Sequence, residues 1–302
     1  MNKKRNDTGI VFFGTPRFAV YVLDALEKSG VVPDVVVTAS DKPAGRGLQL
    51  KEPPVKEWAE ERGILILQPS FLNPLHFGQH SGVDHGLEML MNSEWDLFIV
   101  AAYGKILPKE ILNLPRKGAL NVHPSLLPRF RGASPIESQI LADEKTVGVS
   151  IMLLDEEMDH GPIVSQASVT PEEWPLRASL LEEMLATIGG ELLAETIPPW
   201  LEGTIVPELQ SHGLATFTKK IEKADGCIEI RHRMSDNEGY QNYLKFCAYD
   251  GWPGVYFFTE KDGKNLRVKI TDAEYKNGIF TPLKVIPEGK KEIPYARLAS
   301  FR

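Results

Sequence analysis

The sequence predicts a doubly wound α/β fold with a mostly parallel sheet, followed by a small β-rich domain. In the first half of the 302 residues, short apolar runs alternate with helical patterns, which is typical of a parallel sheet. After residue 214 the apolar runs are short and separated by turn residues, which is typical of antiparallel strands. The length is about twice that of a common domain and favours two domains.

The first predicted strand, residues 10–13, is apolar throughout and ends at Gly14, as expected of a strand buried on both faces. A helix should follow over residues 18–26, with Thr15 as its N-cap and Pro16 in its first turn. The same patterns predict strands at 35–37, 64–67, 97–101 and 119–122, a helix at 55–62 and an apolar run at 149–154. Together these elements predict a Rossmann-like sheet.

Residues 198–213 contain three prolines and two glycines without a long apolar period, so we interpret them as a linker. We therefore expect a first domain over residues 1–199, a linker over 200–214 and a second domain over 215–302. The second domain should be an OB-like barrel with one helix. Its strands are predicted at 227–230, 255–259, 266–270 and 278–282, and its helix at 236–247.

The composition excludes several classes of protein. Hydrophobic residues make up 42% and charged residues 25% of the chain, which argues against a disordered chain, a collagen or a disulfide scaffold. Cys227 and Cys247 have no CxxC spacing, so we expect reduced thiols and no zinc. The chain has no signal peptide pattern and no apolar run near the roughly 18 residues of a membrane span. We expect a cytoplasmic monomer that binds no membrane and no metal.

Charge is unevenly distributed. The net charge is −7, yet residues 208–302 carry +3 and the remainder −10. A basic second domain on an acidic body fits contact with a polyanion. Chance variation in surface charge is the alternative. Neither a GxGxxG nor a Walker pattern occurs, so the sheet need not bind a nucleotide.

Two segments carry groups suited to catalysis. Asn121 and His123 stand two residues apart at the end of a predicted strand, so both side chains should point to one side, at the sheet edge where ligands bind. Asn121 can stabilise an oxyanion, and His123 can polarise a carbonyl or move a proton. The acidic loop 154–162 can present a carboxylate to the imidazole. A structural histidine and a solvated acidic turn are the alternatives.

Several motifs together resemble the folate-dependent formyltransferase superfamily and, within it, the methionyl-tRNA formyltransferases. The resemblance runs from about Gly9 to at least Val268, with the motifs in a consistent order. They are FGTPRFA (13–19), DKPAGRG (41–47), PPVK (53–56), VAAYGKILP (100–108), NVHPSLLP (121–128), RGA (131–133), Asp155, DHG (159–161), ATF (215–217) and WPG (252–254).

The resemblance implies transfer of a formyl group from 10-formyltetrahydrofolate to the amino group of methionine on initiator tRNA. Asn121, His123 and Asp159 take the catalytic places of the family. Ser125, Leu126, Leu127 and Pro128 are expected to contact the folate, with Tyr103, Ile106 and Asp155 beside them. For Tyr103 and Ile106 the alternative is core packing. Arg46 and Lys42, in the loop 41–47, are expected to contact tRNA, as are Lys219 and Lys220, for which a plain solvated face is the alternative.

The sequence departs from the family between Phe71 and Glu94, which contains His76, His80 and several glycines. Because Gly78 weakens a helix there, we interpret this segment as a lengthened loop rather than a metal site. His160 stands where the family often has Thr and could alter the surroundings of Asp159. The alternative functions are a sugar-nucleotide N-formyltransferase with the same donor, a formyl-folate hydrolase, a purine-pathway formyltransferase and a non-catalytic RNA-binding protein.

Overall fold

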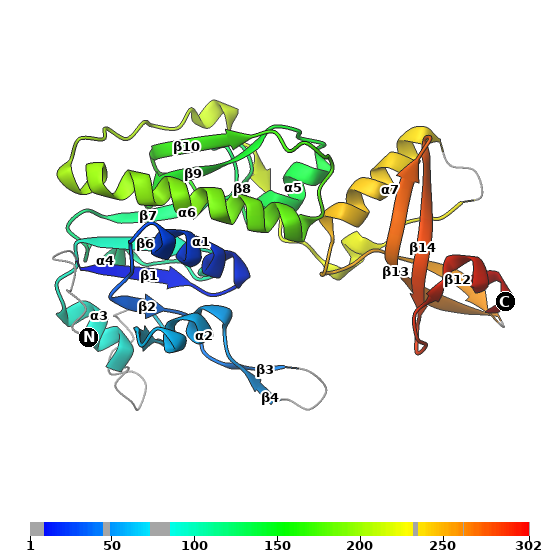
Figure 1. Cartoon of the computed structure of the whole chain (residues 1–302), viewed down its shortest axis with the longest axis horizontal. Coiled ribbons are helices and arrows are strands. Elements are labelled where there is room, and N and C mark those ends of the chain that lie inside the picture. The colour runs from blue at the N-terminus through cyan, green and yellow to red at the C-terminus, as the bar shows by residue number, and fades with distance from the viewer. Residues whose placement is uncertain (1–8, 45–48, 73–84, 232–234, 262, 302) are drawn as a thin grey trace. The chain divides into compact units, whose positions relative to one another are not determined.

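The structure is a computed structural model of the chain. It describes residues 9–44, 49–72, 85–231, 235–261 and 263–301. The chain folds into two compact units, each built from separate segments. The first unit consists of residues 1–131, 148–168 and 183–216, and the second of residues 132–147, 169–182 and 217–302. Figure 1 shows the course of the chain.

A seven-stranded sheet forms the centre of the first unit, with the strand order β10-β9-β7-β6-β1-β2-β5. The neighbours among β1, β2, β5, β6 and β7 pair in parallel, and β9 runs antiparallel to β7. The predicted, mostly parallel sheet is thus confirmed. The strands are β1 (Ile10–Gly14), β2 (Val35–Val37), β5 (Leu65–Leu67), β6 (Leu97–Ala101), β7 (Ala119–His123), β9 (Val147–Leu153) and β10 (Ile163–Val169).

Helices cover both faces of this sheet (Figure 1). On one face, α6 (Ala178–Glu202) lies so close to the sheet that a Cβ on Gly189 would come within 2.6 Å of Val122. The neighbouring Gly190 meets α1 (Arg17–Lys28) equally closely. The helix α2 (Pro54–Glu61) joins α1 through a hydrogen bond from Trp58 Nε1 to Asp24 (2.7 Å).

On the other face, α3 (His85–Asn92) and α4 (Lys109–Leu112) pack on a cluster of apolar side chains from alternate strand positions. Ala119 of β7 belongs to this cluster, whereas Val122 faces α6. Because successive side chains of a strand alternate, Asn121 and His123 point toward the face that carries α3 and α4. The polar side chains of Asn121 and His123 therefore point away from α6, which covers the opposite face.

A short two-stranded arm also belongs to the first unit. Its strands are β3 (Lys42–Ala44) and β4 (Gln49–Lys51), which pair antiparallel. At its base, Asp41 accepts hydrogen bonds from Lys56 Nζ (2.7 Å) and Gln68 Nε2 (2.9 Å). Lys42 and Leu50 of the arm are exposed.

The second unit contains a four-stranded antiparallel sheet in the order β12-β13-β14-β15. The β-rich second domain is thus confirmed; within the described residues no pairing of β12 with β15 closes it into a barrel. A phenol hydrogen bond from Tyr240 to Asp143 (2.8 Å) joins the helix α7 to the segment after α5. The elements are α5 (Pro135–Leu141), α7 (Asp236–Ala248), β12 (Tyr256–Lys261), β13 (Lys264–Lys276), β14 (Ile279–Pro287) and β15 (Ile293–Pro294).

Short elements connect the larger ones. They are β8 (Arg131–Gly132), β11 (Phe217–Thr218), and the 3-10 helices η2 (His212–Leu214), η3 (Lys223–Gly226) and η4 (Tyr295–Phe301).

Three local predictions are wrong. Thr15 does not cap α1: its hydroxyl donates to the carbonyl of Tyr103 (3.1 Å), and the N-cap is Pro16. Pro198 and Pro199 lie inside α6 rather than in a linker. The apolar run 227–230 forms one isolated bridge, Cys227 with Tyr256, instead of a strand. For Thr15, a tertiary contact outweighs the local capping preference. In the described part of the chain, none of the helices has the length and apolarity of a membrane span.

Candidate active site

The predicted catalytic pair lies at the carboxyl end of β7. Asn121 is 9% and His123 4% exposed, and both point to the same face of the sheet. Burying two polar side chains in a central strand costs free energy unless they are hydrogen-bonded. Their burial at this edge of a largely parallel sheet, where ligands of α/β folds bind, favours a functional site over a packing role.

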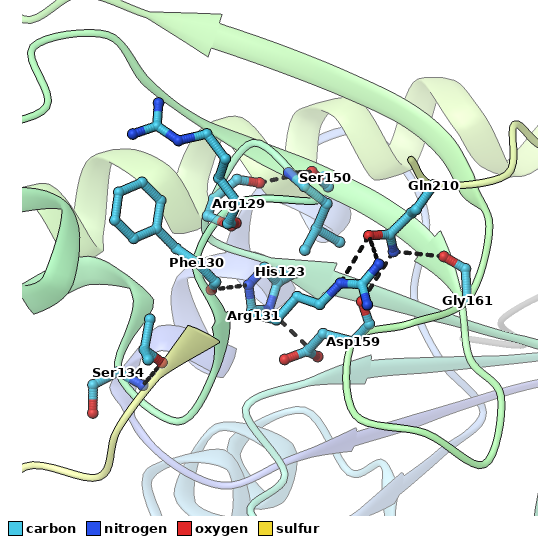
Figure 2. Close-up of polar contacts among 12 residues, drawn as sticks. His123, Arg129, Phe130, Arg131, Ser134, Ser150, Asp159, Gly161 and Gln210 are labelled. Atoms are coloured by element: carbon cyan, nitrogen blue, oxygen red, sulfur yellow. Dashed lines mark hydrogen bonds and ion pairs between the residues drawn. The ribbon is translucent and has the colours of Figure 1, made fainter. Parts of the chain in front are cut away.

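Both ring nitrogens of His123 face oxygen atoms. Nε2 lies 3.0 Å from the carbonyl oxygen of Phe130, and Nδ1 lies 3.6 Å from Oδ1 of Asp159, as Figure 2 shows. A carbonyl oxygen only accepts, so Nε2 carries a hydrogen in this arrangement. The side chain of Asp159 is 14% exposed, so the carboxylate and the imidazole meet in a largely dry place. The structure therefore brings together the predicted His123 and Asp159.

The loop that carries Asp159 has an unusual backbone. Asp159 has a φ of +50°, a left-handed conformation that a residue with a side chain adopts only when its surroundings hold it there. Gly161 follows in a tight turn, where a Cβ would lie 1.9 Å from the carbonyl oxygen of Leu153. The turn thus requires glycine at position 161, two residues after Asp159.

Gln210 holds this loop from the segment after α6. Its amide nitrogen donates to the carbonyls of Asp159 (2.9 Å) and Gly161 (2.7 Å). Its amide oxygen accepts from the guanidinium of Arg131, with Nε at 3.0 Å. Figure 2 shows these groups side by side. Arg131 is 3% exposed and also donates to Nδ1 of His212 (3.0 Å).

The predicted folate segment 125–128 is anchored to β9 and β10. The Ser150 hydroxyl donates to the carbonyl of Ser125 (2.7 Å), and the amide of Leu127 donates to Ser150 Oγ (3.0 Å). Gln166 of β10 donates to the carbonyl of Leu127 (3.0 Å). The Ser125 hydroxyl is fully buried and donates to the carbonyl of Arg129 (2.7 Å). Leu126 and Pro128 are half-buried.

The other predicted folate residues differ in exposure. Tyr103 is 3% exposed and packs edge-on against Phe13, as its core-packing alternative predicts. Ile106 is 83% exposed and open to a ligand. Asp155 accepts a hydrogen bond from His160 Nδ1 (2.7 Å), and the His160 ring stacks on that of His212 with centroids 4.3 Å apart. His160 is thus paired with Asp155.

The predicted tRNA residues are basic groups at the surface. Lys42 is exposed on the arm, and Arg46 lies outside the described residues. In the second unit Lys220 is exposed and Lys219 donates to Asp225 (2.8 Å), a bond that raises the pKa of Lys219. The ammonium of Lys219 thus stays protonated beside Asp225, and its side chain is 77% exposed.

The metal alternative concerned His76 and His80, which lie outside the described residues. Among those that the structure describes, no group of three or more His, Cys, Asp or Glu side chains is arranged to hold a metal ion.

Cys247 is 1% exposed, and burial raises the pKa of its thiol to about 11.

Comparison with known proteins gives the family of the chain. Residues 8–196 match the family described as formyl transferase. A methionyl-tRNA formyltransferase of Chloroflexus aurantiacus is 38% identical over 297 residues, covering 96% of this chain and 88% of that protein. The chain belongs to the formyl transferase family, in the branch of the methionyl-tRNA formyltransferases.

Solved structures agree on the fold of this formyltransferase. A methionyl-tRNA formyltransferase from Clostridium thermocellum matches with a TM-score of 0.55 at 18% identity, covering 95% of this chain and 99% of that one. A sugar N-formyltransferase from a Shewanella species matches with a TM-score of 0.60 at 17% identity, covering 90% and 100%. The superposition thus shows the fold that both kinds of enzyme share.

The sequence patterns do not reveal the support around the site of this formyltransferase. Arg131 belongs to the RGA motif without an assigned role, and Gln210 falls in the predicted linker. A buried glutamine has no periodic signal, and a linker composition predicts exposure. The nearest clue in the sequence is Gln210 itself, an uncharged polar residue that follows the prolines and charges of 198–208.

Proposed function

We propose that this formyltransferase transfers the formyl group of 10-formyltetrahydrofolate to the amino group of methionyl initiator tRNA, giving formylmethionyl-tRNA for translation initiation. The observation that carries the proposal is the meeting of His123 and Asp159 beside Asn121, at the end of a central strand, in a chain 38% identical to methionyl-tRNA formyltransferases. The proposal includes action in the cytoplasm as a monomer.

In the proposed reaction, the methionyl nitrogen attacks the formyl carbon while the bond from that carbon to N10 of the folate breaks. The nitrogen loses one proton and N10 gains one, so the transfer is balanced without a metal or a redox partner. As the attack proceeds, negative charge develops on the formyl oxygen. Asn121 and a protonated His123 supply hydrogen bonds to that oxygen. Asp159 holds the imidazole and assists proton movement, through water, from the nucleophile to N10.

The carbonyl of Phe130 occupies the hydrogen-bonding position of His123 Nε2. A formyl oxygen needs that same position in order to accept from the ring. We therefore expect the Phe130 carbonyl to give way when the donor binds. Releasing Nε2 requires the peptide between Phe130 and Arg131 to rotate, which breaks the hydrogen bond from the Arg131 amide to the carbonyl of Thr216 (2.9 Å).

The donor contacts follow the sequence prediction. We propose that segment 125–128 lies against the pterin ring, with Ile106 and Asp155 lining the same place, while the buried Tyr103 packs on Phe13. The backbone of segment 125–128 is fixed by Ser150 and Gln166, which keeps its apolar side chains in one arrangement. A fixed apolar surface loses little entropy when a flat ring binds to it.

The acceptor contacts are proposed on the arm and the second domain. Arg46 and Lys42 contact the acceptor end of the tRNA, and Lys220, with Lys219, contacts its backbone through phosphate charges. The proposal assigns catalysis to residues 1–199, the linker to 200–214 and tRNA contact to 215–302. Lys42 and Lys220 are exposed, as phosphate contacts require.

A transfer assay tests the proposal. The enzyme and 10-formyltetrahydrofolate are offered methionyl initiator tRNA, free methionine or an amino-sugar nucleotide. We expect product with the charged tRNA and at most background with the other two. Formylation of the sugar nucleotide alone would overturn the proposal and favour a sugar-nucleotide N-formyltransferase. Release of formate without any acceptor would indicate a hydrolase.

A further inference from the structure

Within the proposed reaction, on which this inference rests, we propose that Gln210 is a positioning residue that holds Asp159 against His123. It stands in a segment that the sequence predicts as a linker, yet its side chain is 5% exposed. Its amide makes two donor contacts and accepts from Arg131. A single side chain thus joins the loop of Asp159 to the segment that leads from Phe130.

The first step concerns the loop of Asp159. Both hydrogens of the Gln210 amide nitrogen are used on backbone carbonyls, those of Asp159 and Gly161. The first of these bonds ends on the carbonyl of Asp159 itself, the residue whose φ is +50°. A strained backbone persists only when surrounding contacts over-determine it. The Gln210 amide supplies two such contacts on the loop that presents the carboxylate.

The second step concerns the other side of the glutamine. Its oxygen accepts from Arg131, which directly follows Phe130, whose carbonyl meets His123 Nε2. Both oxygens that face the His123 ring therefore belong to segments tied to Gln210. As Figure 2 shows, Gln210 lies beyond Arg131 and Asp159 when seen from His123, so it acts through these groups and not on a reacting atom.

The contacts at position 210 require an amide side chain, which both donates and accepts hydrogen bonds. Glu has the same length, but its carboxylate oxygens only accept hydrogen bonds, so they would face the carbonyls of Asp159 and Gly161 without a donor. Met has a similar length and removes both kinds of contact. Buried polar groups left without partners cost free energy, so either change should release the loop.

The experiment measures kcat, KM and the pH profile of kcat for Gln210→Met and Gln210→Glu with methionyl-tRNA and 10-formyltetrahydrofolate. We expect kcat to fall about tenfold to a hundredfold, since small displacements of catalytic groups have effects of this size, while KM for both substrates changes less than about threefold. The pH profile should also change, because a loosened Asp159 no longer faces the His123 ring.

A matched control separates positioning from loss of stability. Gln139 is also buried, at 1% exposed, and its amide donates to the carbonyl of Pro135 in α5 (3.0 Å). Gln139→Met should lower Tm by an amount similar to Gln210→Met, yet leave kcat of the folded enzyme and its pH profile unchanged. If Gln210→Met behaves like this control, the inference is overturned.

A double-mutant cycle gives the sharper test. If Gln210 acts through Asp159, then Gln210→Met should cost little further activity in a chain that already carries Asp159→Asn. Independent, multiplicative losses would overturn the inference. Failure of the proposed function is recognised separately, because the unmodified enzyme would then not formylate methionyl-tRNA. If it does so and Gln210→Met matches it, only the inference fails.

Discussion

The loop of Asp159 and the β3–β4 arm of the first unit differ in how firmly they are held. The loop is fixed by the buried Gln210 and by the turn at Gly161. The arm is held at its base by Asp41, whose partners are Lys56 and Gln68, and its side chains Lys42 and Leu50 are exposed. The loop carries a proposed catalytic group, and the arm carries proposed tRNA contacts.

The difference follows from what each kind of group must do. A catalytic carboxylate must keep its distance from an imidazole to a fraction of an ångström, which requires a buried and hydrogen-bonded surrounding. A lysine that meets a phosphate works over a longer range and must reach water before its partner arrives. We therefore expect changes at the buried site to lower kcat and changes on the arm to raise KM for tRNA.

The largest expected effect comes from His123→Ala. Losing a group that stabilises the oxyanion and moves protons should lower kcat by roughly a thousandfold. Steady-state kinetics of formyl transfer measure the loss, and circular dichroism confirms that the chain is folded. His85→Ala is the control, because His85 has an 88% exposed side chain at the start of α3. A folded His123→Ala enzyme with nearly normal turnover would refute the mechanism.

An intermediate effect is expected on the arm. Arg46→Ala and Lys42→Ala should each raise KM for methionyl-tRNA about fivefold. Each should also reduce the slope of log KM for tRNA against log salt concentration by the amount expected for about one phosphate contact. The KM for 10-formyltetrahydrofolate should stay the same. Kinetics at several salt concentrations give both quantities. Lys28→Ala, an exposed lysine at the end of α1, is the control. A change in folate dependence with unchanged tRNA dependence would contradict the role of the arm.

The smallest effect is expected from Asp41→Asn at the base of the arm. Hydrogen bonds from Gln68 and Lys56 hold the pKa of Asp41 below its ordinary value of 3.8. A carboxyl group whose pKa is lower in the folded state stabilises the protein above the ordinary value, and this stabilisation is lost as pH falls through the lowered pKa. Asp41→Asn should therefore lower Tm slightly at pH 7.

Thermal unfolding between neutral pH and the acid limit of the folded state checks this prediction. The Tm difference between Asp41→Asn and the unmodified protein should narrow as the pH falls from 3.8 through the lowered pKa of Asp41, because the carboxyl group is then protonated in the folded protein as well. A difference that stays constant with pH would show that the charge of Asp41 is not its source.

Most of the sheet and the meeting of the proposed catalytic residues were predictable from the sequence. Strands such as β1 and β6 are buried on both faces, so continuous apolar runs mark them. Asn121 and His123 stand out because polar residues at a period of two interrupt such a pattern. The acidic loop 154–162 offers several carboxylates, and the family motifs single out Asp159 among them.

Tertiary structure alone decided how the site is held together. Gln210 lies 51 residues after Asp159 and 79 after Arg131, and no local pattern links residues so far apart. The same reason explains Thr15, whose hydroxyl bonds to Tyr103 instead of capping α1. Local propensity and periodicity determine which segments form strands and helices. Which buried polar groups become partners depends on the folded chain, because each must find a donor or acceptor once water is excluded.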